Sequence, residues 1–516
     1  MPTPSQPPDD DAIPPAWRPI LADLAHRRAA GEAMGGEERV ARQRASGRLD
    51  VRQRIATLCD PGSFVELGVL VGDAVRIPAD GFVAGVGRID GREVAVGGED
   101  FTVLGGSIGI RAHAKRHRLC ELALQERMPL VLLLDGAGER AQNALERYPR
   151  APNDLQVLAR LSGLVPSVVA ILGPSAGHSA LAAPLADFVV MTEAACAFVA
   201  GPPLVQSATG EVTTKEELGG SAVHAASGLA HAVAPDDAAA LGLVRRYLGY
   251  FPSSAWQAPP RLDPSQARFA DLGERRLDAI LDVVPADQRR AYDMTAVLEL
   301  LVDGGELLEL QPGYGRSILT VLARLGGEPA AIVASQPSVK AGSIDADAAD
   351  KAARFIEIAD AFHLPVVFLA DTPGVLVGKA AEREGTLRRA MRMFAAQARM
   401  RGVKIHVTLR KVYGVASCLM AMNPFDGQTA TLAFPSGRIA AMPAAGAGDA
   451  ARADEETRER LDASELGGVY GPADSMSYDD VIDPRELRNR LLHALRVARG
   501  RASEPPTPVA RTGIRP

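Results

Sequence analysis

Two short segments of the sequence are suited to chemistry that needs no reactive side chain. Pro174-Ser175-Ala176-Gly177-His178-Ser179 and Lys411-Val412-Tyr413-Gly414-Val415-Ala416 each end an apolar run at a glycine and lead into an apolar segment of helical character. Backbone N–H groups at a helix start have no acceptor within the helix, and the helix dipole favours negative charge beside them. Such a turn stabilises an oxyanion or an enolate. Glycine at a strand-to-helix turn often serves steric relief alone, so the presence of two equivalent turns is what favours a functional reading.

His178 is the histidine in these turns. Its imidazole would serve as a hydrogen-bond donor or a general acid. Alternatively, the ring fills space at the helix start while the backbone N–H does the work. We favour the role of the N–H group.

Other polar residues near these turns are expected to have structural roles. Tyr413 is expected in the core and Arg410-Lys411 as a solvated or interface charge pair. The spacing of His224 and His231 indicates structural hydrogen bonds rather than metal ligands, and no metal site is predicted. Asp135 and Asp371 each begin a glycine turn, where an Asp side chain commonly bonds to the backbone.

The elements that position the two turns are repeated along the chain. At an offset of 236 residues, Arg88-Ile89-Asp90-Gly91 corresponds to Arg324-Leu325-Gly326-Gly327. The offset then becomes 237, so that Gly177 aligns with Gly414. Further matches at the first offset are Gly106-Ser107-Ile108 with Gly342-Ser343-Ile344, Pro129 with Pro365, Asp135 with Asp371 and Gly138 with Gly374. The chain is therefore predicted to be a duplication of one supersecondary unit.

Each half is expected to contain strands that alternate with helices. A strand pair (83–96 and 319–334) leads into a helix (112–126 and 347–362) and then a buried strand that ends in Asp and Gly. A second apolar strand (167–172 and 404–409) runs into the glycine turn. This alternation predicts an α/β fold with a mostly parallel sheet.

The predicted domains follow from the repeat and from composition. We expect an N-terminal domain at 18–275 and a C-terminal domain at 276–501, with the more polar stretch 274–310 as the linker. The Pro-rich segments 1–17 and 502–516 are expected to be disordered tails.

Composition narrows the class of protein. With 516 residues, 47% of them hydrophobic, the chain fills two or three cores, and a net charge of −6 argues against a nucleic-acid partner. The four cysteines lie too far apart for a zinc knuckle or a redox pair, so we expect reduced thiols of a cytoplasmic protein. The start shows no signal-peptide pattern, and the apolar runs are too short to span a membrane.

The sequence resembles the carboxyltransferase β subunit of biotin-dependent acyl-CoA carboxylases, of the propionyl-CoA and acetyl-CoA carboxylase type. The resemblance covers about residues 38–445. In the first half it rests on Gly47-Arg48-Leu49, Arg54-Ile55, Asp60-Pro61-Gly62-Ser63-Phe64-Val65-Glu66, Asp100-Phe101-Thr102-Val103-Leu104-Gly105-Gly106-Ser107, Gly201-Pro202, Thr209-Gly210-Glu211, Glu217-Leu218-Gly219-Gly220, His224 and Ser227-Gly228-Leu229-Ala230-His231. In the second half it rests on Gln336-Pro337, Ala341-Gly342, Lys351-Ala352-Ala353-Arg354-Phe355, Asp371-Thr372-Pro373-Gly374 and Arg410-Lys411-Val412-Tyr413-Gly414.

The resemblance implies two crotonase-like domains and a transfer of CO2 from carboxybiotin to the α-carbon of a short or medium acyl-CoA. The thioester becomes an enolate, and biotin becomes a ureido anion that takes the α-proton, so two oxyanion holes suffice. By position, the N–H pair of Gly177 and His178 forms the hole for the thioester oxygen. The pair of Val415 and Ala416 forms the hole for the biotin oxygen. Substrate-binding positions carried over in the same way are Gly138, Ala176, Gly414 and Cys418.

The resemblance also implies partners. Neither a biotinylation segment of the Ala-Met-Lys-Met type nor a Gly-rich ATP-grasp region is present. The biotin carboxylase and the biotin carrier are therefore expected on other chains, and the chain itself is expected to form a homohexamer.

The sequence departs from the family pattern at the turns. The family usually has paired glycines there, whereas this chain has Gly177-His178 and Gly414-Val415. The family's Asp-Ser-Gly-Gly-Ala-Arg segment appears as Asp135-Gly136-Ala137-Gly138-Glu139-Arg140, and Cys418 replaces an Asp common in the acyl pocket. A Cβ narrows the approach but leaves the backbone donors in place. Two alternatives remain open: a biotin-independent decarboxylase of malonyl-like thioesters, and a catalytically silent paralogue that scaffolds a carboxylase.

Overall fold

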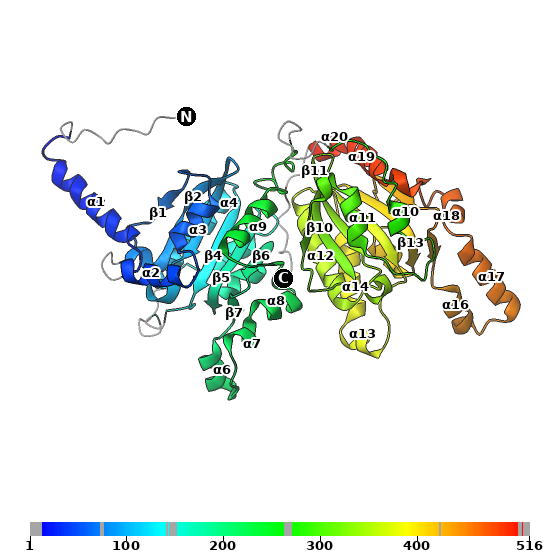
Figure 1. Ribbon diagram of the computed structural model, residues 1–516, viewed down its shortest axis with the longest axis horizontal. Helices are drawn as coiled ribbons and strands as arrows, with labels where there is room; N and C mark the ends of the chain where they lie inside the picture. Colours follow the sequence, from blue (N-terminus) through cyan, green and yellow to red (C-terminus); the bar gives the residue numbers. More distant parts are fainter. Residues whose placement is uncertain are drawn as a thin grey trace.

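The computed structural model describes residues 13–72, 77–140, 143, 152–262, 271–422, 425–503 and 508. Two α/β domains lie side by side, each with a central sheet and helices packed against it (Figure 1). Within the described residues, no helix is both long and apolar enough to cross a membrane.

The first domain is built on an eight-stranded sheet. Its antiparallel edge is formed by the first three strands, and all later pairings are parallel. The seventh strand lies off the main path and pairs with the fifth. In sheet order the strands are β1 (Val65–Leu67), β2 (Phe82–Ile89), β3 (Arg92–Glu99), β4 (Leu130–Gly136), β5 (Ser167–Ala176), β6 (Phe188–Thr192) and β8 (Ala232–Ala234), with β7 (Cys196–Phe198) beside β5.

The second domain repeats this topology. Its strands follow the same order as their counterparts in the first sheet, and the strand off the main path, β15, pairs with β13. The strands are β9 (Leu307–Leu310), β10 (Ile318–Leu325), β11 (Glu328–Ser335), β12 (Val366–Thr372), β13 (Lys404–Tyr413), β14 (Ala430–Ala433) and β16 (Asp480–Val481), with β15 (Arg438–Ala440) beside β13.

Helices cover the sheets and extend from both ends of the molecule. In the first domain they are α1 (Arg18–Glu32), α2 (Glu37–Ala45), α3 (Val51–Leu58), α4 (Ile110–Gln125), α5 (Asp154–Leu161), α6 (Pro202–Thr209), α7 (Lys215–Gly219), α8 (Ser221–Ser227) and α9 (Asp237–Leu248). In the second they are α10 (Ile280–Val283), α11 (Met294–Leu301), α12 (Ala346–Ala361), α13 (Lys379–Arg383), α14 (Thr386–Ala398), α15 (Val415–Leu419), α16 (Ala444–Ala451), α17 (Glu455–Leu466), α18 (Tyr470–Asp474), α19 (Leu487–Val497) and α20 (Arg499–Ser503).

The duplication predicted from the sequence is confirmed. Strands β2, β3 and β4 and helix α4 correspond to β10, β11, β12 and α12 at the offset of 236, and β5 corresponds to β13 at 237. The mostly parallel α/β fold is confirmed as well.

The repeat extends further than the sequence match. In the first domain Asp60 accepts hydrogen bonds from the Asp90 and Gly91 N–H groups at the β2–β3 turn. In the second, Asp303 accepts from the Gly326 and Gly327 N–H groups at the β10–β11 turn. The offset here is 243 rather than 236, because the segment before β2 and the segment before β10 differ in length.

The prediction of a linker at 274–310 is wrong. This stretch forms α10, α11 and β9, and its apolar residues, among them Ile280, Met294 and Leu298, are buried in the core of the second domain. Because Pro285 lies between two helices rather than within one, it does not interrupt the packing. Of the predicted tails, residues 1–12, 504–507 and 509–516 lie outside the described residues, while 502 and 503 end α20.

Candidate functional site

Both predicted turns have the same backbone construction. Strand β5 ends at Ala176, and Gly177 follows with a positive φ of 52° before the 3₁₀ helix Ala180–Leu185. Strand β13 ends at Tyr413, and Gly414 follows with φ 57° before α15. A side chain is strained in this left-handed region, which explains glycine at both positions.

Each turn glycine uses its own N–H group to hold the neighbouring short strand. The Gly177 N–H donates to the Phe198 carbonyl at 3.0 Å, and the Gly414 N–H donates to the Ala440 carbonyl at 2.9 Å. These carbonyls lie at the ends of β7 and β15, which correspond in the two domains. The Gly177 N–H is therefore occupied in this structure.

The unpaired donors are the two residues after each glycine. In the described part of the chain, the N–H groups of His178 and Ser179 and those of Val415 and Ala416 have no hydrogen-bond acceptor. The second pair is the one predicted from the sequence. Of the first predicted pair, Gly177 and His178, only His178 has a free N–H group. The second free donor at this turn is Ser179, which corresponds to Ala416 in the second domain. The two turns thus each present two adjacent free donors, as an oxyanion hole requires.

Gly138 and Ala176 bring the end of β4 against the first turn. Gly138 has φ 81°, and a Cβ there would lie 2.3 Å from the Ala176 carbonyl oxygen. This approach is possible only for glycine. The Gly138 carbonyl in turn accepts a hydrogen bond from the Ile108 N–H at 2.7 Å, which ties the loop before α4 to the same place.

At the second turn, the two donor residues differ in their exposure. The Val415 side chain is 46% exposed, whereas Ala416 is buried. Cys418 is half-buried on α15, and its carbonyl accepts from the Gln397 side chain at 2.9 Å. Cys418 is the one of the four free cysteines that is not buried; the thiols of Cys59, Cys120 and Cys196 are.

A buried charged network lies directly behind the first turn. His178 Nε2 lies 2.6 Å from Asp154 Oδ1, and Asp154 Oδ2 accepts from Arg116 Nε at 2.8 Å. Arg116 also donates to Glu99 at 2.8 Å, and Glu99 accepts from the Ser179 hydroxyl at the same distance. The network therefore fixes both residues that carry the free N–H groups.

Burial and charge shape the protonation of this network. Burial opposes ionisation of Asp154, but the Arg116 guanidinium and the two neighbouring histidines hold the pKa of its carboxyl well below the usual range. Burial raises the pKa of Glu99, although Arg116 and Ser179 act in the opposite direction. Asp154 therefore faces Arg116 and the two histidines as a carboxylate.

The expectation that Asp135 and Asp371 bond mainly to backbone is wrong. Both carboxylates are buried and pair with arginine: Asp135 with Arg48 at 3.0 Å and Arg54 at 2.8 Å, and Asp371 with Arg410 at 2.6 Å. Arg410 is itself buried, so it is neither solvated nor an interface charge. Sequence reasoning missed these pairs because their partners are 39 to 87 positions apart.

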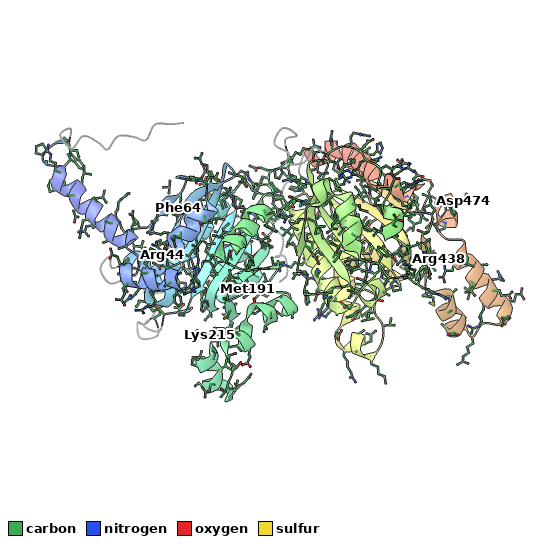
Figure 2. All side chains as sticks on the ribbon, viewed as in Figure 1. Arg44, Phe64, Met191, Lys215, Arg438 and Asp474 are labelled. Atoms are coloured by element: carbon green, nitrogen blue, oxygen red, sulfur yellow. The ribbon has the colours of Figure 1, made fainter. Side chains whose placement is uncertain are left out.

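The remaining polar residues have the structural roles expected. His224 bonds to the Ala197 carbonyl at 2.6 Å, and His231 accepts from the Val189 N–H at 2.9 Å. Tyr413 is buried and donates to Glu465 on α17 at 2.7 Å. Because Glu465 also accepts from the Ala444 N–H, it fastens the projecting helices α16 and α17 beside the second turn, on the side of the molecule where Figure 2 labels Arg438.

A basic pocket next to the first turn escaped the sequence analysis. Helix α2 and the loop after β3 enclose about 500 Å³, lined by Arg39, Arg42, Gln43, Ser46, Arg48, Phe101, Thr102, Leu104 and Gly105. The Arg48 guanidinium lies 4.9 Å from the Phe101 ring centre. The Gly105 carbonyl accepts from the Ala137 N–H, so the pocket adjoins the segment that contains Gly138. The arginines are near neighbours in the sequence, on and just after α2, and the fold adds the distant segment Phe101–Gly105 that completes the pocket.

Comparison with known proteins decides the family. The model of the carboxyl transferase domain matches residues 42–512. The chain belongs to the carboxyl transferase family. This carboxyltransferase is 36% identical over 500 residues to the methylmalonyl-CoA carboxyltransferase 12S subunit of Propionibacterium freudenreichii subsp. shermanii, covering 92% of this chain and 93% of that protein. It is 33% identical over 507 residues to the propionyl-CoA carboxylase carboxyltransferase subunit of Haloferax mediterranei, covering 94% and 97%.

The fold agrees with a solved structure of the family. The crystal structure of transcarboxylase 12S, with methylmalonyl-CoA and methylmalonic acid bound, superposes with a TM-score of 0.87 at 34% identity, covering 95% of this carboxyltransferase and 97% of that chain. The crotonase-like architecture expected from the resemblance is therefore confirmed for both domains, and the chain is an enzyme of the biotin-dependent carboxylase class.

Proposed function

We propose that this carboxyltransferase moves CO2 between carboxybiotin and the α-carbon of a short acyl-CoA. The observation that carries the proposal is the duplicated turn, which presents two adjacent free N–H groups in each domain. The names of the relatives give methylmalonyl-CoA and propionyl-CoA as their substrates, which supports a short acyl chain. The alternatives of a biotin-independent decarboxylase and a silent scaffold gain no support from these turns, because both donor pairs are intact.

In this mechanism the backbone does the electrostatic work. The N–H groups of His178 and Ser179 bind the thioester oxygen and stabilise the negative charge that develops on it in the enolate. The N–H groups of Val415 and Ala416 bind the ureido oxygen of biotin, whose ring supplies the base for the α-proton. No side-chain base is needed, which agrees with a site built from glycine turns.

We assign the basic pocket to the phosphates and adenine of coenzyme A. Arg39 and Arg42 supply positive charge, and the pocket adjoins the loop that leads to Gly138 and the first turn. Phosphate groups favour such guanidinium clusters because the N–H donors match their oxygens.

Arg39→Ala is expected to raise the KM for acyl-CoA about tenfold and to leave kcat unchanged, because it removes binding that is the same in ground and transition states. Arg88→Ala, at an exposed arginine on β2, is the matched control. Equal KM values for the two variants would contradict the assignment of the pocket.

The proposed assembly follows the family. We propose that 18–275 is the acyl-CoA domain and 276–501 the biotin domain, that a biotin carboxylase and a carrier protein act as partners, and that the enzyme is a cytoplasmic homohexamer. The crystal structure of transcarboxylase 12S describes a hexamer, which supports this state. Sedimentation equilibrium of the full chain tests it against the subunit mass of 54.3 kDa.

The deciding experiment measures loss of the carboxyl group from malonyl-CoA and methylmalonyl-CoA, with and without free biotin. We expect loss that depends on biotin, because the ureido ring must accept the carboxyl group before it is released. Loss without biotin would contradict the transferase in favour of a decarboxylase. No loss under either condition, with the biotin carboxylase and carrier supplied, would indicate a silent paralogue.

A further inference from the structure

Three side chains from separate elements gather beside the first turn. His113 comes from α4, Asp154 begins α5, and His178 follows Gly177 at the end of β5. One potential ligand atom from each lies within 4.8 Å of the others. His113 and Asp154 are buried, and His178 is half-buried. The two imidazole rings meet edge to face, with their centres 4.6 Å apart.

The spacing between His113 and Asp154 does not suit a hydrogen bond. His113 Nδ1 lies 3.7 Å from Asp154 Oδ1, beyond the ~2.7–3.2 Å of an N–H···O bond. Two ligands of one tetrahedral zinc ion, each ~2.0–2.1 Å from the metal, lie roughly 3.3 Å apart. The distances from Asp154 Oδ1 to His178 Nε2, 2.6 Å, and to His113 Nδ1, 3.7 Å, fall on either side of this value.

The surroundings of the cluster resemble the outer shell of a metal site. His113 Nε2 lies 2.9 Å from Glu139 Oε2. With an ion bound, the ring would donate its Nε2 proton to Glu139 and offer the Nδ1 lone pair to the metal. Asp154 Oδ2 is held by Arg116 Nε at 2.8 Å, so Oδ1 is the oxygen that faces the two histidines. An ion bound at Oδ1 would replace its hydrogen bond with His178 Nε2. Ligating histidines and carboxylates in proteins are oriented in this way by a second hydrogen bond.

We propose that His113 Nδ1, Asp154 Oδ1 and His178 Nε2 bind a divalent cation of the zinc type. Two imidazole nitrogens and one carboxylate oxygen are ligands that zinc accepts, and three protein ligands leave a fourth position for water. The two carboxylates of Asp154 and Glu139 against the single guanidinium of Arg116 give the cluster a negative charge that suits a cation.

The ion would join α4, α5 and the first turn at one point. It would hold the His178 side chain in place, and so its backbone, and it would add positive charge near the donor pair. The His178 side chain would therefore act as a positioning group: by binding the metal, it would hold the backbone N–H group of the same residue in place. This proposal is independent of the proposed carboxyl transfer, because metal binding is measured without any enzymatic turnover.

The test is metal binding by the untagged full chain. Inductively coupled plasma mass spectrometry of the purified protein is expected to find one zinc per chain. After removal with a chelator, Co²⁺ is expected to restore one equivalent, with the visible absorption of a tetrahedral site. His178→Gly should weaken Co²⁺ binding at least 100-fold. This variant carries the residue common in the family, so it is expected to fold, and its thermal unfolding is recorded to show that it does.

His117→Ala is the matched control. His117 lies one turn along α4 from His113, and its Nδ1 faces the Asn153 carbonyl rather than the cluster. This variant should bind Co²⁺ as the unaltered chain does. The proposal is overturned if the unaltered chain binds neither metal, or if His178→Gly binds Co²⁺ as tightly as the unaltered chain. The first result would show that hydrogen bonds alone hold the cluster.

Discussion

At the scale of single residues, the chemistry of this protein depends on where N–H groups remain unpaired. The side chains that differ from the family pattern, His178 and Val415, keep their backbone donors. Val415 is the first residue of α15, directly after the Gly414 turn. Proline fits this first helical position but has no N–H group, so the contribution of one donor is open to a direct test.

Val415→Pro is expected to lower biotin-dependent carboxyl transfer about 10²- to 10³-fold in kcat, the usual effect of removing one oxyanion-hole donor. Val415→Ala keeps the donor and should retain activity close to that of the unaltered enzyme. Steady-state kinetics with malonyl-CoA and free biotin measure both variants. Full activity of the proline variant would place the biotin oxygen elsewhere.

At the scale of elements, a pair of equivalent lysines holds the start of the second strand of each sheet, β2 in the first domain and β10 in the second. Lys115 on α4 donates to the carbonyls of Ala79 and Phe82 at the start of β2. Lys351, 236 positions later on α12, donates to the Gln311, Tyr314 and Ile318 carbonyls at 2.9–3.1 Å. Both amines are buried. They hold each long helix against the start of this strand, which lies at the same end of the sheet as the carboxyl ends of β3, β4 and β5.

Burial lowers the pKa of Lys351 from its ordinary 10.5 to about 8, although Glu309 and Asp345 act in the opposite direction. Between these values the unfolded chain binds a proton that the folded chain does not, so stability rises with pH from about 8 to 10.5. Relative to Lys351→Met, the unaltered protein should gain on the order of 3 kcal/mol of unfolding free energy across this window.

Thermal or denaturant unfolding at a series of pH values measures this difference. Lys340→Met is the control, because the pKa of Lys340 is raised by its hydrogen bond with Asp345 and the residue stays protonated across most of the window. A difference between the unaltered protein and Lys351→Met that stays constant with pH would contradict the prediction.

At the scale of the whole molecule, one of the apolar cores is shared by the two domains. A continuous cluster contains residues of both, including Tyr247 and Phe251 of the first domain and Phe362 of the second. The Phe251 and Phe362 rings meet edge to face, 5.6 Å apart, and Phe251 also lies 4.6 Å from Tyr247. The Gln311 N–H group adds a hydrogen bond to the His231 carbonyl across the junction. The domains that carry the two turns are therefore packed directly against each other.

Phe251→Ala should lower the unfolding free energy by about 3–5 kcal/mol, because it leaves a cavity at the junction of the domains. The single unfolding transition in calorimetry should then separate into two, as each domain unfolds by itself. Val377→Ala, at a side chain that is 83% exposed, should change little. Unfolding of Phe251→Ala in one unshifted transition would show that the domains are coupled by other contacts.

The sequence by itself determined the family, the duplication and the two glycine turns. These features can be read from neighbouring residues. A strand, a glycine and a helix follow one another directly in the sequence, and the two repeated units lie at a nearly constant spacing. The same local reasoning predicted a linker at 274–310. The apolar residues of α10 and α11 form short groups, and most of the strands against which they pack come from other parts of the chain.

The tertiary structure alone decided which N–H groups are free and which charges meet. The Gly177 N–H group is occupied because β7 lies beside β5. No local sequence pattern predicts that pairing. Likewise, the His113–Asp154–His178 cluster, the arginine partners of Asp135 and the basic pocket each join residues from distant positions. Side chains meet across a sheet according to strand order and helix packing, and these are set by burial of apolar surface over the whole chain rather than by neighbours in sequence.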